Sequence, residues 1–433
     1  MRDMTYVEFF DKDMLHNVCS SLYCPPDRIC FAGGNPEQMN AFAARYCAVM
    51  NERFGKRYEK DKNLFLCRLN PRDGVKRIVS RIKMEILDRW DDCVFDITGG
   101  SEVYLIALGM IAAERKAEGR TVQMQKFRFE KNSIRDIDQQ QNELIGKVMA
   151  PGLTVEQLIR IYGGRVVYSG ERENATHVWN WTEDFKRSVD SMWSVCRRDP
   201  ELWNRQIAIA KEGMRLSPRE VFIATGCTEP DREKRARAER YDAGFWTALR
   251  DEGLLEISAY LHGAALRFKD EQICRCLTEQ GKVLELKICL SAMRAEKESG
   301  GRIYENVLCG VYIDWDGILQ ERARLDTSNE VDAVLMHGLI PVFVSCKNGA
   351  VDGDELYKLS TVARRFGGAE GKKVLAASLV RDKEEETALM IRAKGMGVKV
   401  LDANDLSIAS AGYDRGDREA DGILNAAVAA LWR

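Results

Sequence analysis

Short apolar runs alternate with longer amphipathic stretches over the first 120 or so residues of the chain. The short runs are rich in β-branched and aromatic residues and predict strands, whereas the longer stretches repeat apolar residues at helical spacing. The predicted strands are 5–10, 27–31, 63–69 and 92–97, and the predicted helices are 37–54, 72–90 and 102–114. Strands that alternate with helices in this way predict a parallel sheet with helices on both faces.

The pattern changes twice further along the chain. From about 138 to 269 it is mostly helical, and 244–268 predicts a helix followed by two strands, the outline of a winged helix. From 277 onward the predicted elements are a helix at 278–297, strands at 307–315, 331–336 and 340–346, a helix at 353–366, a strand at 374–379, a helix to about 394, a strand at 398–401 and a helix at 422–432. We therefore expect an α/β protein with a Rossmann-like domain at 1–137, a helical middle linker region with a winged-helix-like unit at 138–270, and a second α/β domain at 271–433.

Composition narrows the class of protein. The 433 residues carry 65 Lys and Arg against 67 Asp and Glu, for a net charge of -2, with 13 Cys and 4 His. This balance does not mark a nucleic-acid binder, although a nuclease needs to be basic only where the strand lies. The cysteines lie singly within apolar runs and the histidines are far apart, which predicts reduced core thiols rather than structural zinc. The acidic start and the lack of a long apolar stretch predict a cytoplasmic protein without membrane contact.

The residues suited to phosphodiester hydrolysis lie in the last third of the chain. This reaction needs carboxylates that hold a metal ion and a cation that orients the nucleophile or stabilises developing charge. Asp332 lies in one predicted strand and Lys347 ends the next, where strand alternation places Ser345 on the same face as Lys347. Glu285 lies on the preceding helix, and Glu355 opens the following one. A lysine at the end of an apolar strand is costly without an anionic partner, so Lys347 is the most informative of these residues, the alternative being a lysine that reaches out to solvent.

The segment that contains these residues resembles a known nuclease superfamily. The stretch NEVDAVLMHGLIPVFVSCKNG, with DGDELYKLSTVARRFGG after it and GKVLEL and GVYIDWDG before it, is similar to PD-(D/E)xK nucleases. It is more closely similar to the nuclease domain of CRISPR-associated effectors activated by cyclic oligoadenylate, over roughly 280–380. The resemblance implies that Asp332 is a ligand of Mg²⁺ or Mn²⁺ and that Lys347 is the catalytic lysine. It also implies a metal contact from the backbone carbonyl of Cys346.

The chain departs from the family pattern at Ser345, which stands where the second carboxylate is usual. A serine hydroxyl is a much poorer metal ligand than a carboxylate. Some members of the superfamily have Ser-x-Lys with a glutamate on a neighbouring helix, and Glu355 matches that position. Glu285 is the alternative or additional ligand. If neither glutamate reaches the ion, we expect an inactive site.

A glycine turn follows the fourth predicted strand. Thr98, Gly99, Gly100 and Ser101 precede a helix, so glycines that admit close backbone approach lie next to unpaired helix N–H groups. A second turn at 33–35 follows another strand. No G-x-G-x-x-G follows the first strand, so a dinucleotide site is not indicated. A plain tight turn is the alternative for either motif.

Together with the nuclease pattern, this turn resembles the CRISPR-associated Rossmann-fold sensor domain, known as CARF, mainly over residues 92–110. The resemblance implies that a cyclic oligoadenylate, most directly cyclic tetra-adenylate, binds across the two-fold interface of a homodimer. Thr98, Gly99, Gly100 and Ser101 would hold phosphate or ribose. Asp11 and Asn35 are expected as further contributors.

The leading hypothesis is a ligand-gated endonuclease of type III CRISPR antiviral defence that cuts single-stranded RNA or DNA, or duplex DNA. One alternative is a ligand-responsive regulator that binds DNA through the winged-helix outline and carries an inactive nuclease domain. A restriction-type enzyme without a second messenger is another. A HEPN ribonuclease would need an Arg-x4-6-His motif, which Arg172 to His177 matches, but the strand-rich C-terminal pattern does not fit an all-helical domain.

Overall fold

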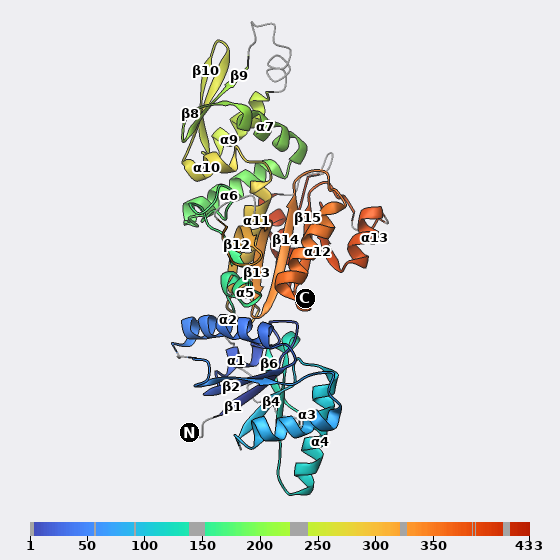
Figure 1. Cartoon of the computed structure of the whole chain (residues 1–433). Helices are drawn as coiled ribbons and strands as arrows, with labels where there is room; N and C mark the ends of the chain where they lie inside the picture. Colours follow the sequence, from blue (N-terminus) through green and yellow to red (C-terminus); the bar gives the residue numbers. More distant parts are fainter. Residues whose placement is uncertain are drawn as a thin grey trace.

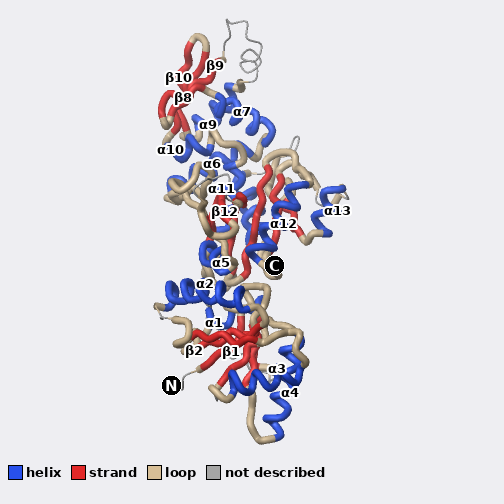
Figure 2. Tube along the Cα trace, viewed as in Figure 1, coloured by secondary structure: helices blue, strands red, loops and turns tan. Residues whose placement is uncertain are grey.

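Three sheets stacked along one long axis form the core of the molecule (Figures 1 and 2). The computed structural model describes residues 4–55, 58–90, 92–137, 152–225, 241–320, 327–382, 384–385, 387–409 and 416–433. Figure 1 shows an N-terminal unit at one end, a C-terminal unit in the centre and a distal unit, formed by the middle of the sequence, at the other end. Within the described ranges, no helix is long and apolar enough to cross a membrane.

The N-terminal unit is a sheet with helices on both faces. Its strand order is β3-β2-β1-β4-β5-β6, and every neighbouring pair is parallel except β5 and β6. Helices α1 and α2 cover one face and α3 and α4 the other, because alternate strand residues belong to two different core clusters. The elements are β1 (Thr5–Phe9), α1 (Cys19–Tyr23), β2 (Arg28–Gly33), α2 (Pro36–Phe54), β3 (Leu64–Arg68), α3 (Val75–Ile82), η1 (Lys83–Leu87), β4 (Cys93–Asp96), α4 (Glu102–Ala117), β5 (Gln123–Arg128), η2 (Phe129–Lys131) and β6 (Ser133–Asp136).

The C-terminal unit is a mixed sheet of order β16-β15-β14-β13-β12-β7. Strands β14 to β16 are parallel and β7 to β14 antiparallel. Helix α11 packs on one face and α12 and α5 on the other. The elements are α5 (Val155–Ile161), β7 (Arg165–Val166), α11 (Lys282–Arg294), β12 (Asn306–Asp314), β13 (Ser328–His337), β14 (Ile340–Lys347), α12 (Asp354–Gly367), β15 (Lys372–Ala377), α13 (Ala388–Gly395), β16 (Val398–Leu401) and α14 (Asp417–Ala429).

The distal unit contains the helix and hairpin that 244–268 predicts, together with a second hairpin. Helix α9 precedes the β10–β11 hairpin, and the four strands form a sheet of order β10-β11-β9-β8. A HEPN motif would require Arg172 and His177 to lie in a helix. They precede this unit in a segment that is not helical. The elements are α6 (Glu183–Cys196), α7 (Pro200–Glu212), β8 (Met214–Ser217), β9 (Glu220–Ala224), α9 (Ala243–Asp251), β10 (Leu255–Tyr260), β11 (Gly263–Phe268) and α10 (Glu271–Cys276).

The range 138–270, expected to be one middle linker region, is divided in space. Within its described residues, α5 and β7 join the C-terminal unit, where Val166 pairs with Ile313 of β12. The elements from α6 to α10 pack instead against α11 around a common core, with Trp193 and Leu286 among its buried side chains. Because α5 belongs to the C-terminal unit and contacts α2, the N-terminal and C-terminal units touch each other directly.

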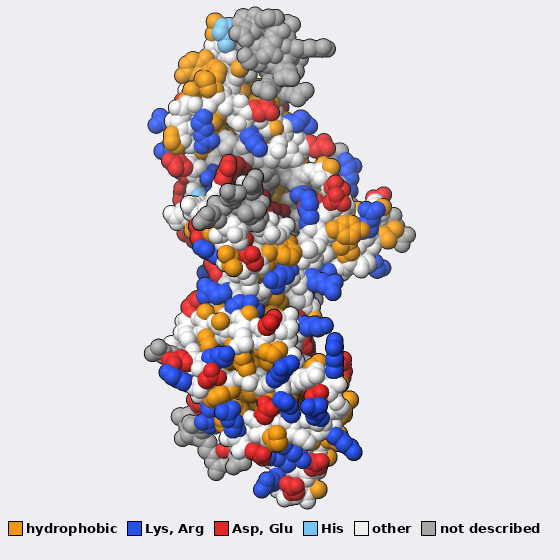
Figure 3. Space-filling model, viewed as in Figure 1, with side chains coloured by type: hydrophobic (Ala, Val, Ile, Leu, Met, Phe, Trp, Pro, Cys, Tyr) orange, Lys and Arg blue, Asp and Glu red, His pale blue; other side chains and the backbone are white. Residues whose placement is uncertain are grey.

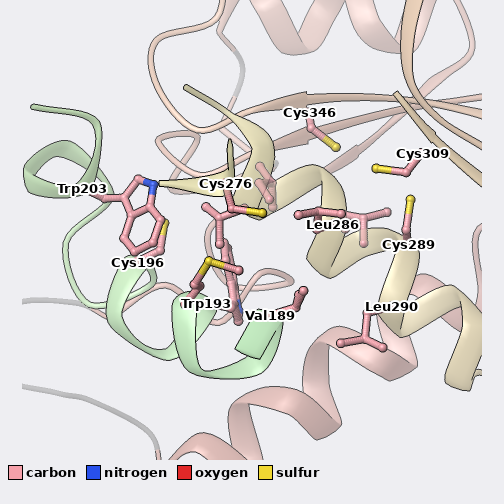
Figure 4. Close-up of a cluster of buried hydrophobic side chains, with 14 of the residues drawn as sticks. Val189, Trp193, Cys196, Trp203, Cys276, Leu286, Cys289, Leu290, Cys309 and Cys346 are labelled. Atoms are coloured by element: carbon pink, nitrogen blue, oxygen red, sulfur yellow. The ribbon is translucent and has the colours of Figure 1, made fainter. Parts of the chain in front are cut away.

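The cysteines are core residues, as the sequence predicts. The described cysteines are free thiols and nearly all are buried. Figure 4 shows Cys289 on α11 near Cys309 and Cys346 of the sheet, with the sulfur atoms pointing toward one another. Since Cys346 faces α11, its neighbours Ser345 and Lys347 face the opposite side, toward α12.

Candidate active site and ligand-binding turn

Asp332 lies where the ladder between β13 and β14 opens. The antiparallel register ends at the pair Ala333 and Val344, so Asp332 and Ser345 are the next opposed residues. Asp332 Oδ2 accepts hydrogen bonds from the Cys346 backbone N–H at 2.6 Å and from Ser345 Oγ at 3.3 Å. Burial raises the pKa of the Asp332 carboxyl, although the Cys346 N–H opposes this shift. The carboxylate is therefore fixed to the strand that carries the lysine.

Lys347 meets Glu355 across the same pocket. Lys347 Nζ lies 3.2 Å from Glu355 Oε2, while Lys358 Nζ lies 3.2 Å from Glu355 Oε1. A pocket of about 250 Å³ is lined by both lysines and Glu355, together with Asp332 and Ser345. The structure thus brings four of the five residues proposed as catalytic candidates to one cavity.

Glu285, the fifth candidate, lies beside this pocket on α11. Its Oε2 is 2.9 Å from Lys282 Nζ, and Lys282 is also 3.4 Å from Glu330 Oε1. Burial raises the pKa of Glu285 to about 8; Lys282 opposes this shift and the nearby Asp332 charge reinforces it. Glu285 and Asp332 are therefore close enough to repel each other, and a cation between them would relieve that repulsion.

Glu330, Lys282 and Lys358 also belong to this charged cluster, and the sequence alone did not indicate them. Glu330 lines the pocket and accepts a hydrogen bond from Tyr312 Oη at 2.7 Å. Its position two residues before Asp332 on one strand is a signal that strand alternation offers. Lys358 lies one helical turn after Glu355, and Lys282 one turn before Glu285, so helical spacing would have found both.

The donor groups suit a hard divalent cation. Within the part of the chain that the structure describes, no three His, Cys, Asp or Glu side chains already converge on a metal position. Asp332 and Glu355 nevertheless line one pocket, and both offer carboxylate oxygens, the ligands that Mg²⁺ and Mn²⁺ prefer. Burial raises the pKa values of both Asp332 and Glu285 and so favours their protonated forms, whereas a bound cation would favour the ionised carboxylates. The residues therefore fit the ion that the resemblance implies.

The glycine turn lies at the point where the strand order of the N-terminal sheet reverses, between β1 and β4, the usual ligand position in such sheets. Asp11, which follows β1, accepts a hydrogen bond from the Gly100 N–H through Oδ2 at 2.8 Å. Gly100 has φ +97°, and a Cβ on Gly99 would lie 2.7 Å from Asp11 Cβ. The Asp11 carboxylate therefore already accepts the hydrogen bond from the N–H group that a bound anion would use.

Of the other expected contributors, Thr98 and Asn35 have local hydrogen-bond partners. Thr98 Oγ1 accepts a hydrogen bond from Phe127 N at 2.7 Å, and Thr98 N donates to the buried Asp96 at 2.8 Å. Ser101 is the first residue before α4, and its hydroxyl makes no capping bond. Asn35 caps α2 by accepting from Gln38 N at 3.1 Å. Asn35 therefore has a structural role that the sequence pattern did not reveal.

The loop after β1 also reaches the C-terminal unit. Asp13 N donates to Asp11 Oδ1 at 2.8 Å, and Asp13 Oδ2 accepts from Ala369 N, just beyond α12, at 2.7 Å. Tyr162, at the end of α5, donates its hydroxyl to Asp13 Oδ1. Asp11 and Asp13 thus connect the glycine turn to the end of the helix that carries Glu355.

This arrangement defines a class of protein in which a Rossmann-like α/β domain precedes a second α/β domain built on a mixed sheet. No family model and no curated protein sequence matches the chain. Its structure is similar to protein VC1899 from Vibrio cholerae, with a TM-score of 0.69 and 13% identity over 100% of both chains. It is also similar to Can2 from Sulfobacillus thermosulfidooxidans, solved in complex with cyclic tetra-adenylate, with a TM-score of 0.62 and 15% identity over 98% of this chain and 97% of Can2. The fold class predicted from the sequence is confirmed.

Proposed function

We propose that this chain is a divalent-metal-dependent endonuclease of type III CRISPR defence whose activity is gated by cyclic oligoadenylate. The observation that carries the proposal is the single pocket that holds Asp332, Lys347 and Glu355, in which a helix glutamate stands in for the carboxylate missing at Ser345. Can2, which has the same fold, was solved with cyclic tetra-adenylate bound. That ligand is therefore the first activator to test.

The chemistry follows from the groups that line the pocket. Mg²⁺ or Mn²⁺ held by Asp332 and Glu355 would supply a water of lowered pKa and would neutralise charge on the scissile phosphate. Lys347 Nζ, which lines the same pocket, orients the attacking water or a phosphate oxygen. Ser345 donates to Asp332 and keeps that carboxylate turned toward the pocket. Glu285 is a further ligand, and the Cys346 carbonyl remains a predicted metal contact.

Gating starts at the glycine turn. A ligand phosphate that binds the Gly100 N–H must displace the Asp11 carboxylate, because the two anions compete for one donor. Displacement of Asp11 frees its second oxygen from Asp13 N and so alters the loop that contacts Ala369. The signal then reaches α12, whose other end carries Glu355.

The active form is a homodimer in this proposal. Ile106 and Met110 on α4, and Met84 on η1, are 55%, 39% and 64% exposed. Large apolar side chains on neighbouring helices are typical of a surface that a second copy covers. A dimer formed through this face would place two glycine turns on either side of one ligand.

The test is cleavage of labelled single-stranded RNA, single-stranded DNA and supercoiled plasmid with Mg²⁺ or Mn²⁺, with and without cyclic tetra-adenylate. Ligand-dependent cutting that disappears in Lys347→Ala, while that variant still binds the ligand, supports the proposal. Cutting that is equally fast without ligand would favour a restriction-type enzyme. Tight ligand binding without any cutting would remove the nuclease assignment.

A ligand-responsive DNA-binding regulator is the second candidate, and two observations favour it. Ser345 provides no carboxylate, and the distal unit has a helix followed by the β10–β11 hairpin, whose tip exposes Tyr260 and Leu261. Failure to bind duplex DNA in a sequence-specific way, with or without cyclic tetra-adenylate, would count against this candidate.

A further inference from the structure

A basic cavity lies at the opposite end of α12 from the active-site pocket. It measures about 620 Å³ and is lined by Arg364, Lys372, Lys373, Lys399 and Arg433, without any acidic side chain. Figure 3 shows Lys and Arg side chains gathered where the C-terminal unit approaches the N-terminal unit. Five like charges around one cavity repel one another, and a polyanion would relieve that repulsion.

The cations of this cavity differ in their contacts with the fold. Lys373 and Lys399 donate to the backbone carbonyls of Met396 and Ala430, contacts that hold the cavity wall. By contrast, no carboxylate among the described residues lies within ion-pair distance of Arg364 or Lys372. Glu370 acts on Lys372 through space, but its side chain lines a different cavity. Arg364 and Lys372 are therefore the groups available to an added anion.

The neighbouring residue Arg365 shows the contrast clearly. It donates to the carbonyl oxygens of Tyr162 and Trp315 at 2.7 and 3.3 Å and so joins α12 to the rest of the unit. Arg364, one position earlier on the helix, is exposed and faces the cavity instead. Two adjacent arginines of α12 therefore differ in role: Arg365 holds the fold together, and Arg364 faces the cavity.

An exposed stripe of α12 connects the basic cavity to the active-site pocket. Tyr357, Thr361 and Arg364 are exposed and share one face of the helix at i, i+4 and i+7 spacing. Arg364 lines the cavity, and Lys358, the residue after Tyr357, lines the pocket. Tyr357 is 53% exposed, and an exposed aromatic side chain is a group on which a base can stack. Six residues of helix rise by about 9 Å, roughly the length of three nucleotides of a helical strand.

We propose that this stripe and the basic cavity form the track that binds the substrate strand, with phosphates at Arg364 and Lys372 and a base stacked on Tyr357. The inference rests on the proposed nuclease function and names the path by which a single-stranded nucleic acid reaches the pocket. Its backbone runs from the cavity along α12 to Lys358 and Lys347. The stacking contact and the phosphate contacts together favour single strands, because the face of a base inside a duplex is covered by the neighbouring stacked bases.

Binding can be measured without cleavage. Fluorescence anisotropy of a labelled single-stranded DNA or RNA of about 12 nucleotides is recorded in EDTA over a range of salt concentrations. We expect the double variant Arg364→Glu, Lys372→Glu to bind at least about tenfold more weakly, with a salt slope shallower by about 1.4, or about 0.7 for each phosphate that the protein no longer neutralises. Tyr357→Ala should weaken binding by at least about fivefold without changing the salt slope. Lys211→Glu, at an exposed position of α7 in the distal unit, is the control for reversing one charge away from the track.

The outcomes separate this proposal from the nuclease assignment. Unchanged affinity in the α12 variants, or an equal loss in Lys211→Glu, overturns the track. Displacement of the oligonucleotide by cyclic tetra-adenylate at stoichiometric concentration also overturns it, since the cavity would then be a second ligand site. A wild-type protein that binds through the track but never cuts retains the track and loses the nuclease function.

Discussion

Glu355 is the proposed metal ligand whose position in the site is set by the packing of a helix against the sheet. It is the carboxylate that pairs with Lys347, and it stands on a helix rather than on the strand. We expect Glu355→Gln to lower the cleavage rate at least about 100-fold and to raise the metal concentration needed for half-maximal activity, because one metal ligand is removed. The measurement is the cleavage rate across a titration of Mn²⁺.

The adjacent acid provides a matched control for this prediction. Asp354 is exposed, opens the same helix and does not line the pocket. Asp354→Asn removes the same charge and should leave the cleavage rate within about twofold, since exposed charges contribute little. If Glu355→Gln cuts as fast as Asp354→Asn, Glu355 has no catalytic role.

Glu285 predicts an unusual dependence of stability on pH. Burial raises its pKa from 4.5 to about 8, so the folded protein binds a proton that the unfolded chain releases between these values. The free energy of unfolding therefore falls as the pH rises from about 5 to about 8. Glu285→Gln removes this loss and should be more stable relative to wild type at about pH 9 than at about pH 5, by roughly 1–3 kcal/mol.

Thermal unfolding at the two pH values, without divalent cations, checks this prediction. Glu298→Gln, at an exposed position of the same unit, should show the same difference from wild type at both pH values. Added Mn²⁺ should stabilise wild type more than Glu285→Gln at high pH, because the ion binds the ionised carboxylate. A difference between Glu285→Gln and wild type that does not vary with pH would contradict the assigned pKa.

At the level of elements, the glycine turn depends on close backbone approach. A Cβ on Gly99 would lie 2.7 Å from Asp11 Cβ, so the loop after β1 would have to move. We expect Gly99→Ala to weaken binding of cyclic tetra-adenylate at least about tenfold, since the amide donors of the turn shift away from the phosphate. Isothermal titration calorimetry measures this weakening.

A second glycine controls for the general effect of an added methyl group. Gly422 lies in α14, and a Cβ there would meet no atom within 4 Å. Gly422→Ala should leave ligand binding unchanged and stabilise the helix by about 1 kcal/mol. Equal weakening of binding in both variants would show that the turn has no special part in recognition.

The sequence predicts the longer elements well because their signals are local. The apolar runs at 5–10 and 340–346 correspond closely to β1 and β14, since consecutive apolar residues are buried on both faces of a sheet. The helix predicted at 278–297 is shorter, because Gly281 adopts a left-handed conformation and α11 begins after it. The helix predicted at 72–90 changes to π geometry at Lys83. A two-residue strand such as β7 carries no periodic signal at all.

The candidate site is predictable only as far as spacing within one element allows. Strand alternation places Ser345 and Lys347 on one face, and the structure agrees. The ion pair between Lys282 and Glu330 joins α11 to β13 across 48 residues, so no local pattern indicates it. The roles of these residues in metal binding and catalysis remain predictions.

At the scale of the whole molecule, the order of units in space differs from their order in the sequence. The distal unit lies at the end farthest from the N-terminal unit, and α2 meets α5 directly (Figure 1). Glu52 on α2 binds Arg160 at 2.6 Å and Gln157 at 2.9 Å, both on α5. One hydrophobic core also includes Phe42 and Phe366 from the two units. A change at the glycine turn can therefore pass to the C-terminal unit without the distal unit.

In the proposed gating, Asp13 is the residue that links the two units. It receives the Ala369 N–H and the Tyr162 hydroxyl from the C-terminal unit, and its own N–H binds Asp11. We expect Asp13→Ala to retain ligand affinity within about threefold and to reduce ligand-stimulated cleavage about 5- to 150-fold, the usual range of a coupling free energy. Unstimulated cleavage should not fall, because Asp13 lies far from the pocket at the other end of α12.

Two further variants show whether the contact itself carries the coupling. Tyr162→Phe removes one hydrogen bond to Asp13 and keeps the buried ring, so it should reduce stimulation less than Asp13→Ala does. Lys12→Ala changes an exposed neighbour in the same loop and should stimulate like wild type. Because any coupling is reciprocal, bound oligonucleotide should also raise ligand affinity in wild type and not in Asp13→Ala. If Asp13→Ala responds fully to the ligand, the two units communicate by another path, and the contact at Ala369 only holds them together.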